Sequence, residues 1–190
     1  VQLPDGTPVT VSTTLTPAQL GTLVYVPPAD YLPGTPVGTI GYTVSNGPAL
    51  ASGVVSVTVL PVNDPPVAQS GSANGVEDST IPVSLVGTDV DGTVTQVVVQ
   101  QLPAFGTLLL ADGVTPVLAG QTLTAAQAGS LVFRPDPNAF GNTAIVFTVL
   151  DNSGAVSAPA NWAIAVAAAN DAPVLTVPAA QTAAEDGSLV

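Results

Sequence analysis

Short runs in which apolar and polar residues alternate dominate the chain. Val55, Val57 and Val59 alternate with Ser56 and Thr58, and the run from 162 to 166 has the same pattern. A period of two places the apolar side chains on one face of a β-strand, so each run predicts a strand with one buried face. Other apolar residues share this same-face spacing and are expected in the core: Ile40, Tyr42, Val44, Leu23, Tyr25, Ile145, Phe147, Val149, Leu131, Phe133.

The sequence also repeats itself over a long period. Asn63-Asp-Pro-Pro-Val67 returns as Asn170-Asp-Ala-Pro-Val174, 107 residues later, and Glu77-Asp78 returns as Glu185-Asp186, a shift of 108. This period is too long for solenoid units but is close to the roughly 100 residues of a β-sandwich domain, so each repeat is expected to have its own core. The predicted division is the last part of a first repeat (1–62), a complete repeat (63–169) and the start of a third (170–190).

Turn residues divide the complete repeat into short elements. The chain has 18 Gly and 19 Pro, which favour turns over long helices. One helical turn is expected at 122–128 and another at 14–19, with Thr124 and Thr16 as N-caps. Seven strands are expected, near 66–70, 79–87, 93–102, 106–111, 130–134, 143–150 and 160–168, and this number is typical of a sandwich.

Composition narrows the possible partners. Arg134 is the only basic residue, Lys and His are absent, and 13 Asp and Glu give a formal net charge of -12. Nucleic acid and anionic membranes are therefore unfavourable partners. A cluster of carboxylates in such a chain has to be solvated, protonated or neutralised by a metal ion, because almost no cationic side chain is present.

Other classes are excluded in the same way. There is no cysteine, and hence no disulfide framework or thiolate metal site. No apolar run approaches the roughly 18 residues that span a bilayer, so membrane insertion is not expected. Val1 opens in a polar, strand-like stretch without a basic leader region, which predicts a fragment or an internal segment of a mature protein.

Five motifs in order carry a resemblance to a known family. They are Asn63-Asp-Pro-Pro-Val67, Glu77-Asp-Ser79, Asp89-Val-Asp-Gly92, Ser130-Leu-Val-Phe-Arg-Pro135 and Phe147-Thr-Val-Leu-Asp-Asn-Ser-Gly154. Together they resemble the bacterial cadherin-like (tandem Ig-like) repeats of giant secreted surface adhesins of the RTX type. The resemblance implies an all-β fold of tandem seven-stranded Greek-key β-sandwiches, calcium at the repeat junctions, and an extracellular role as an extender or adhesive region.

The alternation of strand direction sorts the acidic residues by end. Asp64 enters the complete repeat at one end, and Asp89, Asp91 and Asp151 follow strands that return to that end. Asp carboxylates, the Asn63 amide and turn carbonyls are hard oxygen ligands, which suit Ca²⁺, whereas zinc is disfavoured without Cys or His. We therefore predict a calcium site here.

A second predicted site lies at the opposite end. Glu77 follows the first strand, which places it beside Asn170 and Asp171. The strand at 79–87 separates Glu77 from Asp89 by about 30 Å at roughly 3.3 Å per residue, so the two cannot bind one ion.

Several acidic or amide residues have a simpler interpretation. Asp5 and Asp112 precede Gly and are expected to bind the backbone of their own turns. Asp136 and Asn138 are also expected to be structural. The preceding repeat has Asn46 where Asp151 stands, which removes one charge and predicts a weaker site or none there.

Catalysis is not expected. Without His, Cys or Lys the common bases and activated nucleophiles are missing, and a carboxylate-pair hydrolase would need an aromatic cleft, whereas the aromatics here have core spacing. Two functions remain. The first is a calcium-stiffened extender whose partners are the adjacent repeats. The alternative is an interaction module that binds surface glycans or another copy of itself and assembles into a filament or matrix.

Overall fold

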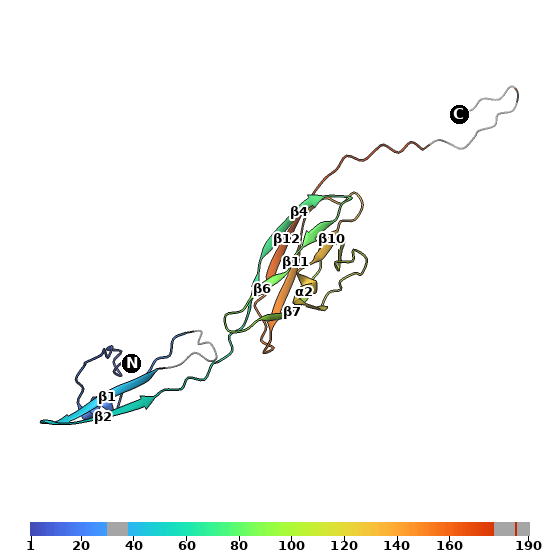
Figure 1. Cartoon of the computed structure of the whole chain (residues 1–190). Coiled ribbons are helices and arrows are strands. Elements are labelled where there is room, and N and C mark those ends of the chain that lie inside the picture. Colours follow the sequence, from blue (N-terminus) through green and yellow to red (C-terminus); the bar gives the residue numbers. More distant parts are fainter. Residues whose placement is uncertain (30–37, 177–184, 186–190) are drawn as a thin grey trace.

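The computed structural model describes residues 1–29, 38–176 and 185. Within them the chain forms two short helices and twelve strands, and the strands β3 to β12 build one β-sandwich (Figure 1). None of the described helices has the length and apolar character needed to cross a membrane. The elements, in chain order, are α1 (Pro17–Leu20), β1 (Thr39–Asn46), β2 (Ala49–Ser56), β3 (Val67–Gln69), β4 (Gly71–Val76), β5 (Ile81–Val83), β6 (Val86–Thr88), β7 (Val94–Gln101), β8 (Thr107–Leu109), β9 (Thr122–Thr124), α2 (Ala125–Ala128), β10 (Leu131–Arg134), β11 (Gly141–Asp151) and β12 (Ala160–Ala167).

Two sheets form the sandwich. One has the strand order β4-β12-β11-β7-β9 and the other β5-β10-β8, with β3 and β6 forming a separate pair. All neighbouring strands are antiparallel except β4 and β12, which run parallel from the pair Gly71 and Trp162 to the pair Val76 and Ala167. The first long strand and the last strand of the sandwich therefore lie side by side.

The core lies between these sheets, where the alternation predicts it. Ile81, Leu131 and Phe133 from one sheet pack in the same buried cluster as Phe147 and Ile164 from the other. Burying such side chains contributes about 1.5–3 kcal/mol each, so this cluster is the main stabilising feature of the sandwich. The prediction of an all-β sandwich is confirmed for this part of the chain.

Each of the seven expected strands overlaps an observed one, but the number of strands differs. The expected strand at 79–87 is divided into β5 and β6, and β4 and β9 were not expected. Gly71, Asn74 and Gly75 are poor strand formers, yet β4 forms because β12 supplies a complete partner. Gly71 is required there, since an added Cβ would lie 2.2 Å from the Trp162 ring.

Both helical turns form as predicted. Thr16 caps α1 and Thr124 caps α2, and in each the side chain of Gln19 or Gln127 bonds back to the cap. This reciprocal arrangement is the capping box, which satisfies two backbone donors at the start of a helix.

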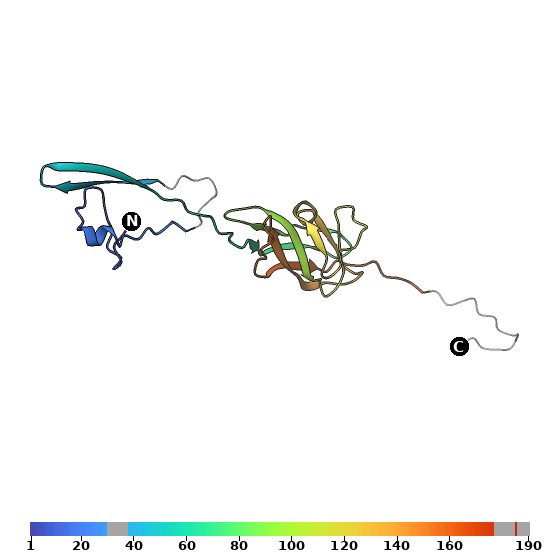
Figure 2. The same cartoon turned by 90° about the horizontal axis from the view of Figure 1, so that it is seen from below.

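The described residues before the linker, 1–29 and 38–62, form a different kind of structure. Their β1 and β2 pair as an antiparallel hairpin, and extended residues connect this hairpin to the sandwich (Figures 1 and 2). Tyr42 is 37% exposed, although the equivalent Phe147 is 0% exposed. Val44, also expected in the core, is 50% exposed. The expectation that Tyr42 and Val44 are core residues is therefore wrong for this structure, because in the described residues no second sheet packs on the hairpin.

Candidate acidic site at the entry end of the sandwich

The linker that enters the sandwich is held to it by two acidic side chains. The Asn63 side-chain Nδ2 donates to Asp151 Oδ2 at 2.7 Å, and the Asp64 backbone N–H donates to Asp91 Oδ2 at 3.2 Å. Asp91 follows β6 and Asp151 ends β11, so the linker contacts two loops that are far apart in the sequence. The sequence predicts that these residues meet at one end of the sandwich, and the structure places them there.

Asp151 is fully engaged within the protein. It is 3% exposed, and its Oδ1 accepts the backbone N–H groups of Ser153 and Ala155, both at 2.8 Å. The Asn63 amide is the largest influence on the pKa of this carboxyl, and with the backbone N–H groups of Ala155, Ser153 and Gly154 it outweighs burial and leaves the pKa below its ordinary value. Asp151 therefore positions the linker and its own loop, and it has little capacity left to bind an ion.

Asp89 and Asp91 accept fewer hydrogen bonds than Asp151 does. Both carboxylate oxygens of Asp89 and Oδ1 of Asp91 are buried and accept no hydrogen bond from the described residues. A buried charged oxygen without a partner is costly, so these three atoms need a donor or a cation. They are the atoms through which this site would bind a ligand.

A residue that sequence reasoning missed completes this arrangement. Asn152 Oδ1 accepts the Thr93 N–H at 2.8 Å, and it lies 2.4 Å from where a Cβ on Gly92 would stand. Asp89 Oδ2 lies 2.5 Å from the same point. Gly92 is thus the residue that leaves room for the two oxygens. The Asp-x-Asp-Gly and Asp-Asn motifs contain both residues, but only the fold shows that they meet.

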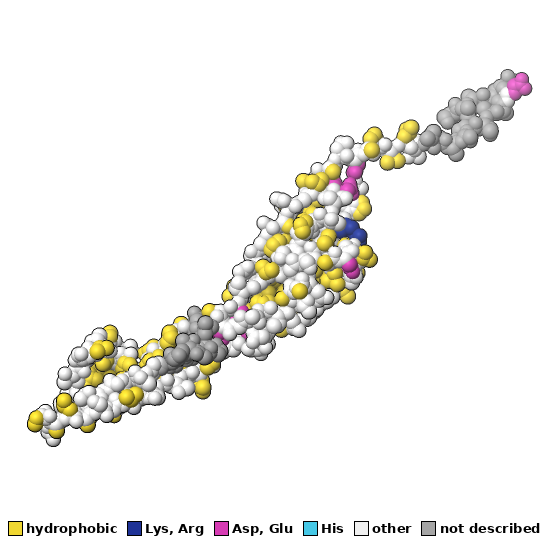
Figure 3. Space-filling model, in the orientation of Figure 1, with side chains coloured by type: hydrophobic (Ala, Val, Ile, Leu, Met, Phe, Trp, Pro, Cys, Tyr) yellow, Lys and Arg dark blue, Asp and Glu magenta, His cyan; other side chains and the backbone are white. Residues whose placement is uncertain are grey.

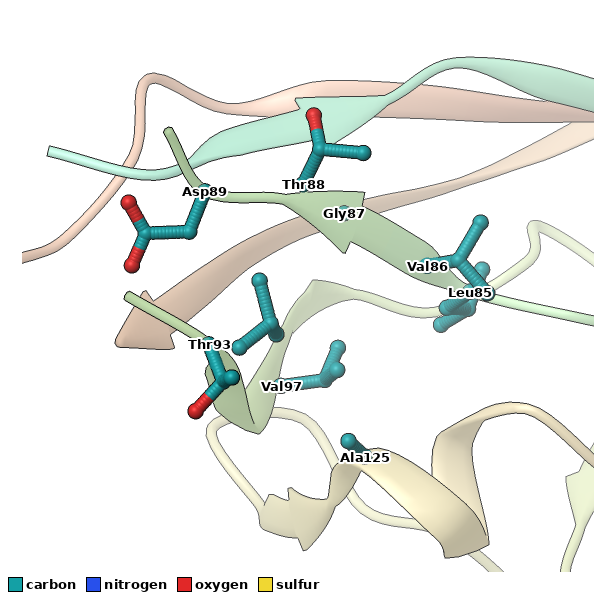
Figure 4. Close-up of a pocket in the computed structure, with 9 residues that line it drawn as sticks. Leu85, Val86, Gly87, Thr88, Asp89, Thr93, Val97 and Ala125 are labelled. Atoms are coloured by element: carbon teal, nitrogen blue, oxygen red, sulfur yellow. The ribbon is translucent and has the colours of Figure 1, made fainter. Parts of the chain in front are cut away.

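Asp89 lies at the edge of a cleft with several apolar walls. Asp89 and Thr93 lie at one end of a cleft of about 350 Å³ whose other walls include Leu85, Val97 and Ala125 (Figure 4). In Figure 4 the carboxylate of Asp89 points away from Leu85, Val97 and Ala125, and its Oδ2 lies on the side of Gly92 and Asn152.

The oxygen atoms at this site are suitable ligands for a hard cation, but they are few. Among the described residues, no group of three or more Asp, Glu, His or Cys side chains lies close enough to hold a metal ion. Calcium takes six to eight oxygen ligands. Three unpartnered oxygens on Asp89 and Asp91, with Asn152 beside them, would need backbone carbonyls or water to complete the coordination.

The opposite end of the sandwich carries a second buried carboxylate. Glu77 is 4% exposed, its N–H donates to Ala167 at 3.0 Å, and its Oε1 accepts the Ala169 N–H at 2.7 Å. Its Oε2 is buried and accepts no bond from any described residue. Figure 3 shows acidic side chains near both ends of the sandwich.

The remaining predicted site residues at this end are exposed. Asn170 and Asp171 continue beyond β12, and Asn170 Nδ2 donates to the Asp171 carbonyl at 3.2 Å. Asn63 makes the equivalent bond to the Asp64 carbonyl, also at 3.2 Å. The Asn-Asp motif therefore has the same local form in both linkers. Glu77 contacts the adjacent Ala169 rather than either of these side chains.

The residues predicted to be structural bind their own surroundings. Asp112 accepts bonds from Val114 and Thr115 within its turn, and Asp5 accepts one from Thr7. Hydrogen bonds from these turns lower the pKa of both carboxyls. Asp136 Oδ2 accepts the Gly106 N–H at 2.9 Å and connects two loops.

Comparison with known proteins identifies the fold family. No curated protein matches the chain. Among solved structures, the fibronectin(III)-like modules of Clostridium thermocellum CbhA match at 18% identity over 71% of this chain and 65% of that chain. The TM-score is 0.32, and a likeness of this size carries no structural argument.

The family match covers most of the sandwich. A bacterial Ig domain model matches residues 63–161, which is most of β3 to β12. Ig-like domains are generally non-catalytic structural modules, and bacterial ones are typically extracellular or on the cell surface. The match supports the Ig-like part of the expected resemblance, while the cadherin-like adhesin type stays a prediction. The chain belongs to the family of bacterial Ig domains.

Proposed function

We propose that the chain is a load-bearing spacer of an extracellular surface protein, stiffened by calcium at the ends of its sandwich. The observation that carries the proposal is the parallel pairing of β4 and β12. The chain enters near Asp64 at one end and leaves beyond Ala167 at the other.

Tension along the chain loads this pair in shear. A pull on the entering linker draws β4 toward the entry end, and a pull on the departing linker draws β12 toward the exit end. All the hydrogen bonds along the six paired residues then resist together, whereas bonds in an unzipping pair break one at a time. The sandwich is built to transmit force between its two linkers.

The contacts at each end extend this resistance. Asn63 and Asp64 fasten the entering linker to Asp151 and Asp91, and Glu77 fastens the departing backbone at Ala169. Without them, the linkers would pivot about the ends of β3 and β12. A chain of such units with fixed linkers would hold a distal domain away from the cell.

Calcium is the proposed neutralising ion at both ends. Asp89 and Asp91 at entry and Glu77 at exit carry the buried oxygens that accept no bond from the described residues. Arg134 is the only basic residue in the sequence. With only two carboxylates at the entry site, the expected Kd is in the range of extracellular modules, about 10⁻⁴–10⁻³ M. Asn170 and Asp171 would contribute to the exit site only once a following domain is present.

The repeat pattern supports a tandem arrangement. Thr16 and Thr124 cap helical turns of the same form, and the hairpin of β1 and β2 corresponds in sequence to β11 and β12. Residues 1–62 and 170–190 are then parts of neighbouring units, and the adjacent units are the main partners.

Single-molecule pulling in two directions tests the load-bearing role. The chain has no cysteine, so introduced cysteines give unique attachment points. Attachment at Val62→Cys and Asn170→Cys loads β4 and β12 in shear, whereas Thr80→Cys and Asn170→Cys lie at one end and unzip them. We expect a clearly higher unfolding force in shear, and a further rise with calcium. Equal forces in both geometries would contradict the proposal.

A further inference from the structure

The turn of the N-terminal hairpin has the features of a reactive amide. Asn46 is the last residue of β1, and Gly47 and Pro48 form the two-residue turn to Ala49. Gly47 has a φ of +62°, and a Cβ added to it would meet nothing within 4 Å. Asn46 is exposed, and the Gly47 N–H donates to no backbone carbonyl of the described residues.

We infer that Asn46 is a site of spontaneous deamidation. The Gly47 backbone nitrogen loses its proton to a base in solution and attacks Asn46 Cγ. The new N–C bond closes a five-membered succinimide, and the side-chain nitrogen takes up a proton from the solution and leaves as ammonia when its bond to Cγ breaks. Water then opens the ring at either carbonyl, which gives aspartate or isoaspartate at position 46. The reaction needs no enzyme, metal or oxidant.

Local structure decides whether the nitrogen can reach the side chain. Ring closure requires the backbone of Asn46 to rotate away from the extended conformation of a strand. Asn46 and Ala49 are the final pair of the hairpin, so this rotation disrupts only the end of the ladder. Such terminal pairs open at little cost in free energy.

The chain contains its own comparison in Asn74-Gly75. These residues lie inside β4, where Asn74 pairs with Ala165 and Gly75 with Val166. A Cβ on Gly75 would stand 2.5 Å from Ile81 Cγ1, so the backbone there is packed against the core. Rotation at Asn74 would break the β4 and β12 pairing, and we expect its amide to survive while the fold is intact.

Deamidation would change the residue at the end of β1, in the unit that contains residues 1–62. Asn46 ends β1 as Asp151 ends β11, although the turn after Asn46 is shorter than the loop after Asp151. Aspartate at position 46 would place a carboxylate where the complete sandwich has Asp151. Isoaspartate would add a backbone carbon at the last pair of the hairpin. Deamidation therefore divides an ageing population of chains into two forms.

Peptide mapping of the full chain tests the inference. Trypsin is unsuitable because Arg134 precedes Pro135 and Lys is absent, but a protease that cleaves before Asp separates 30–63 from 64–77. The folded chain is incubated at mildly alkaline pH, and the conversion of amide to acid is followed by mass at Asn46 and Asn74. Aspartate at 46 also creates a new cleavage site, whereas isoaspartate does not. Asn46→Gln is the matched control.

The urea-unfolded chain sets the time scale. We expect both Asn-Gly pairs to react in urea, but only Asn46 to react in the folded chain, and Asn46→Gln to stay unmodified there. Survival of Asn46 in the folded chain over the time in which the unfolded chain is converted would overturn the inference. Equal rates at Asn46 and Asn74 in the folded chain would overturn it as well. Neither result bears on the load-bearing proposal.

Discussion

Asn63 and Asp151 are 88 positions apart in the sequence, yet the Asn63 amide donates to the Asp151 carboxylate at 2.7 Å. This bond joins the linker to the loop after β11, and it is the largest cause of the lowered pKa of Asp151. The folded state therefore favours the ionised form of the Asp151 carboxyl, because the Asn63 amide in the linker donates to it. Together with the two bonds to Oδ1, this bond leaves Asp151 fewer free lone pairs for a metal ion than Asp89 has.

The first prediction concerns the pH dependence of this contact. Because the pKa of Asp151 is lower in the folded than in the unfolded state, its contribution is fully present above the ordinary pKa of Asp and is lost as pH falls through the folded value. We expect wild type to be more stable than Asp151→Asn at neutral pH. The difference should shrink as the solution becomes more acidic than the ordinary Asp range. Urea unfolding midpoints at a series of pH values, with chelator present, measure it.

A control separates this contact from general charge effects. Asp171→Asn removes one charge from an exposed position beyond β12. Its difference from wild type should be small and should vary little with pH. The same pH profile for both variants would show that net charge, rather than the contact with Asn63, is responsible.

The second prediction concerns calcium at Asp89 and Asp91. A hundredfold excess of calcium over the Kd of the entry site should stabilise the chain by about 2.7 kcal/mol through that site, and the double variant Asp89→Asn, Asp91→Asn should lose this contribution. In chelator the double variant should be at least as stable as wild type, because it removes two charges with three buried oxygens that accept no bond from the described residues, and Asn at position 91 can still accept the Asp64 N–H. Thermal unfolding with calcium and with chelator checks both statements.

The matched control removes the same charge elsewhere. Asp5 and Asp112 bind their own turns and are exposed. The variant Asp5→Asn, Asp112→Asn should keep the full calcium response. An identical response in both double variants, or no response in wild type, would refute the calcium site.

The third prediction concerns the space beside Gly92. A Cβ there would stand 2.4 Å from Asn152 Oδ1 and 2.5 Å from Asp89 Oδ2, both at the ends of side chains. Gly92→Ala should therefore move these oxygens rather than unfold the chain, with a stability change in chelator below about 1 kcal/mol. Calcium affinity should fall by about tenfold or more, as for other changes beside metal ligands. Gly41→Ala, where an added Cβ meets nothing within 4 Å, should leave both properties unchanged.

Much of the sandwich could be predicted from the sequence, because alternation and turn residues are local signals. Phe133 and Phe147 were expected in the core and are 0% exposed. The strand β4 was missed because Gly71 and Gly75 lack strand propensity, and its pairing with β12 joins segments about 90 residues apart. No local sequence pattern predicts a pairing between strands so far apart in the chain.

The candidate site could also be predicted only in part. Strand direction places Asp64, Asp89, Asp91 and Asp151 at one end, and the contacts among them and the linker agree with this. The sequence does not distinguish Asp151, whose oxygens accept bonds from Asn63, Ser153 and Ala155, from Asp89, whose oxygens accept none from the described residues. That distinction depends on which backbone N–H groups the fold directs toward each carboxylate.

The fourth prediction concerns Glu77 at the exit end. Glu77→Ala removes the bond to the Ala169 N–H and should cost about 1.5–3 kcal/mol, the range for a hydrogen bond to a charged group. Glu77→Gln keeps that bond through Oε1 and places a neutral amide where Oε2 is buried, so in chelator it should lie within about 1 kcal/mol of wild type. Urea unfolding of both variants compares the two contributions.

The neighbouring Asp78 supplies the control for this prediction. Asp78 is exposed and has a φ of +61°, a conformation that Asn also tolerates, so Asp78→Asn removes one charge without altering the turn. It should resemble wild type in chelator. If Glu77→Gln were as destabilised as Glu77→Ala while Asp78→Asn stayed unchanged, the negative charge of Glu77 itself would be stabilising. The hydrogen bond to Ala169 would then not be the main contact that fixes the departing linker.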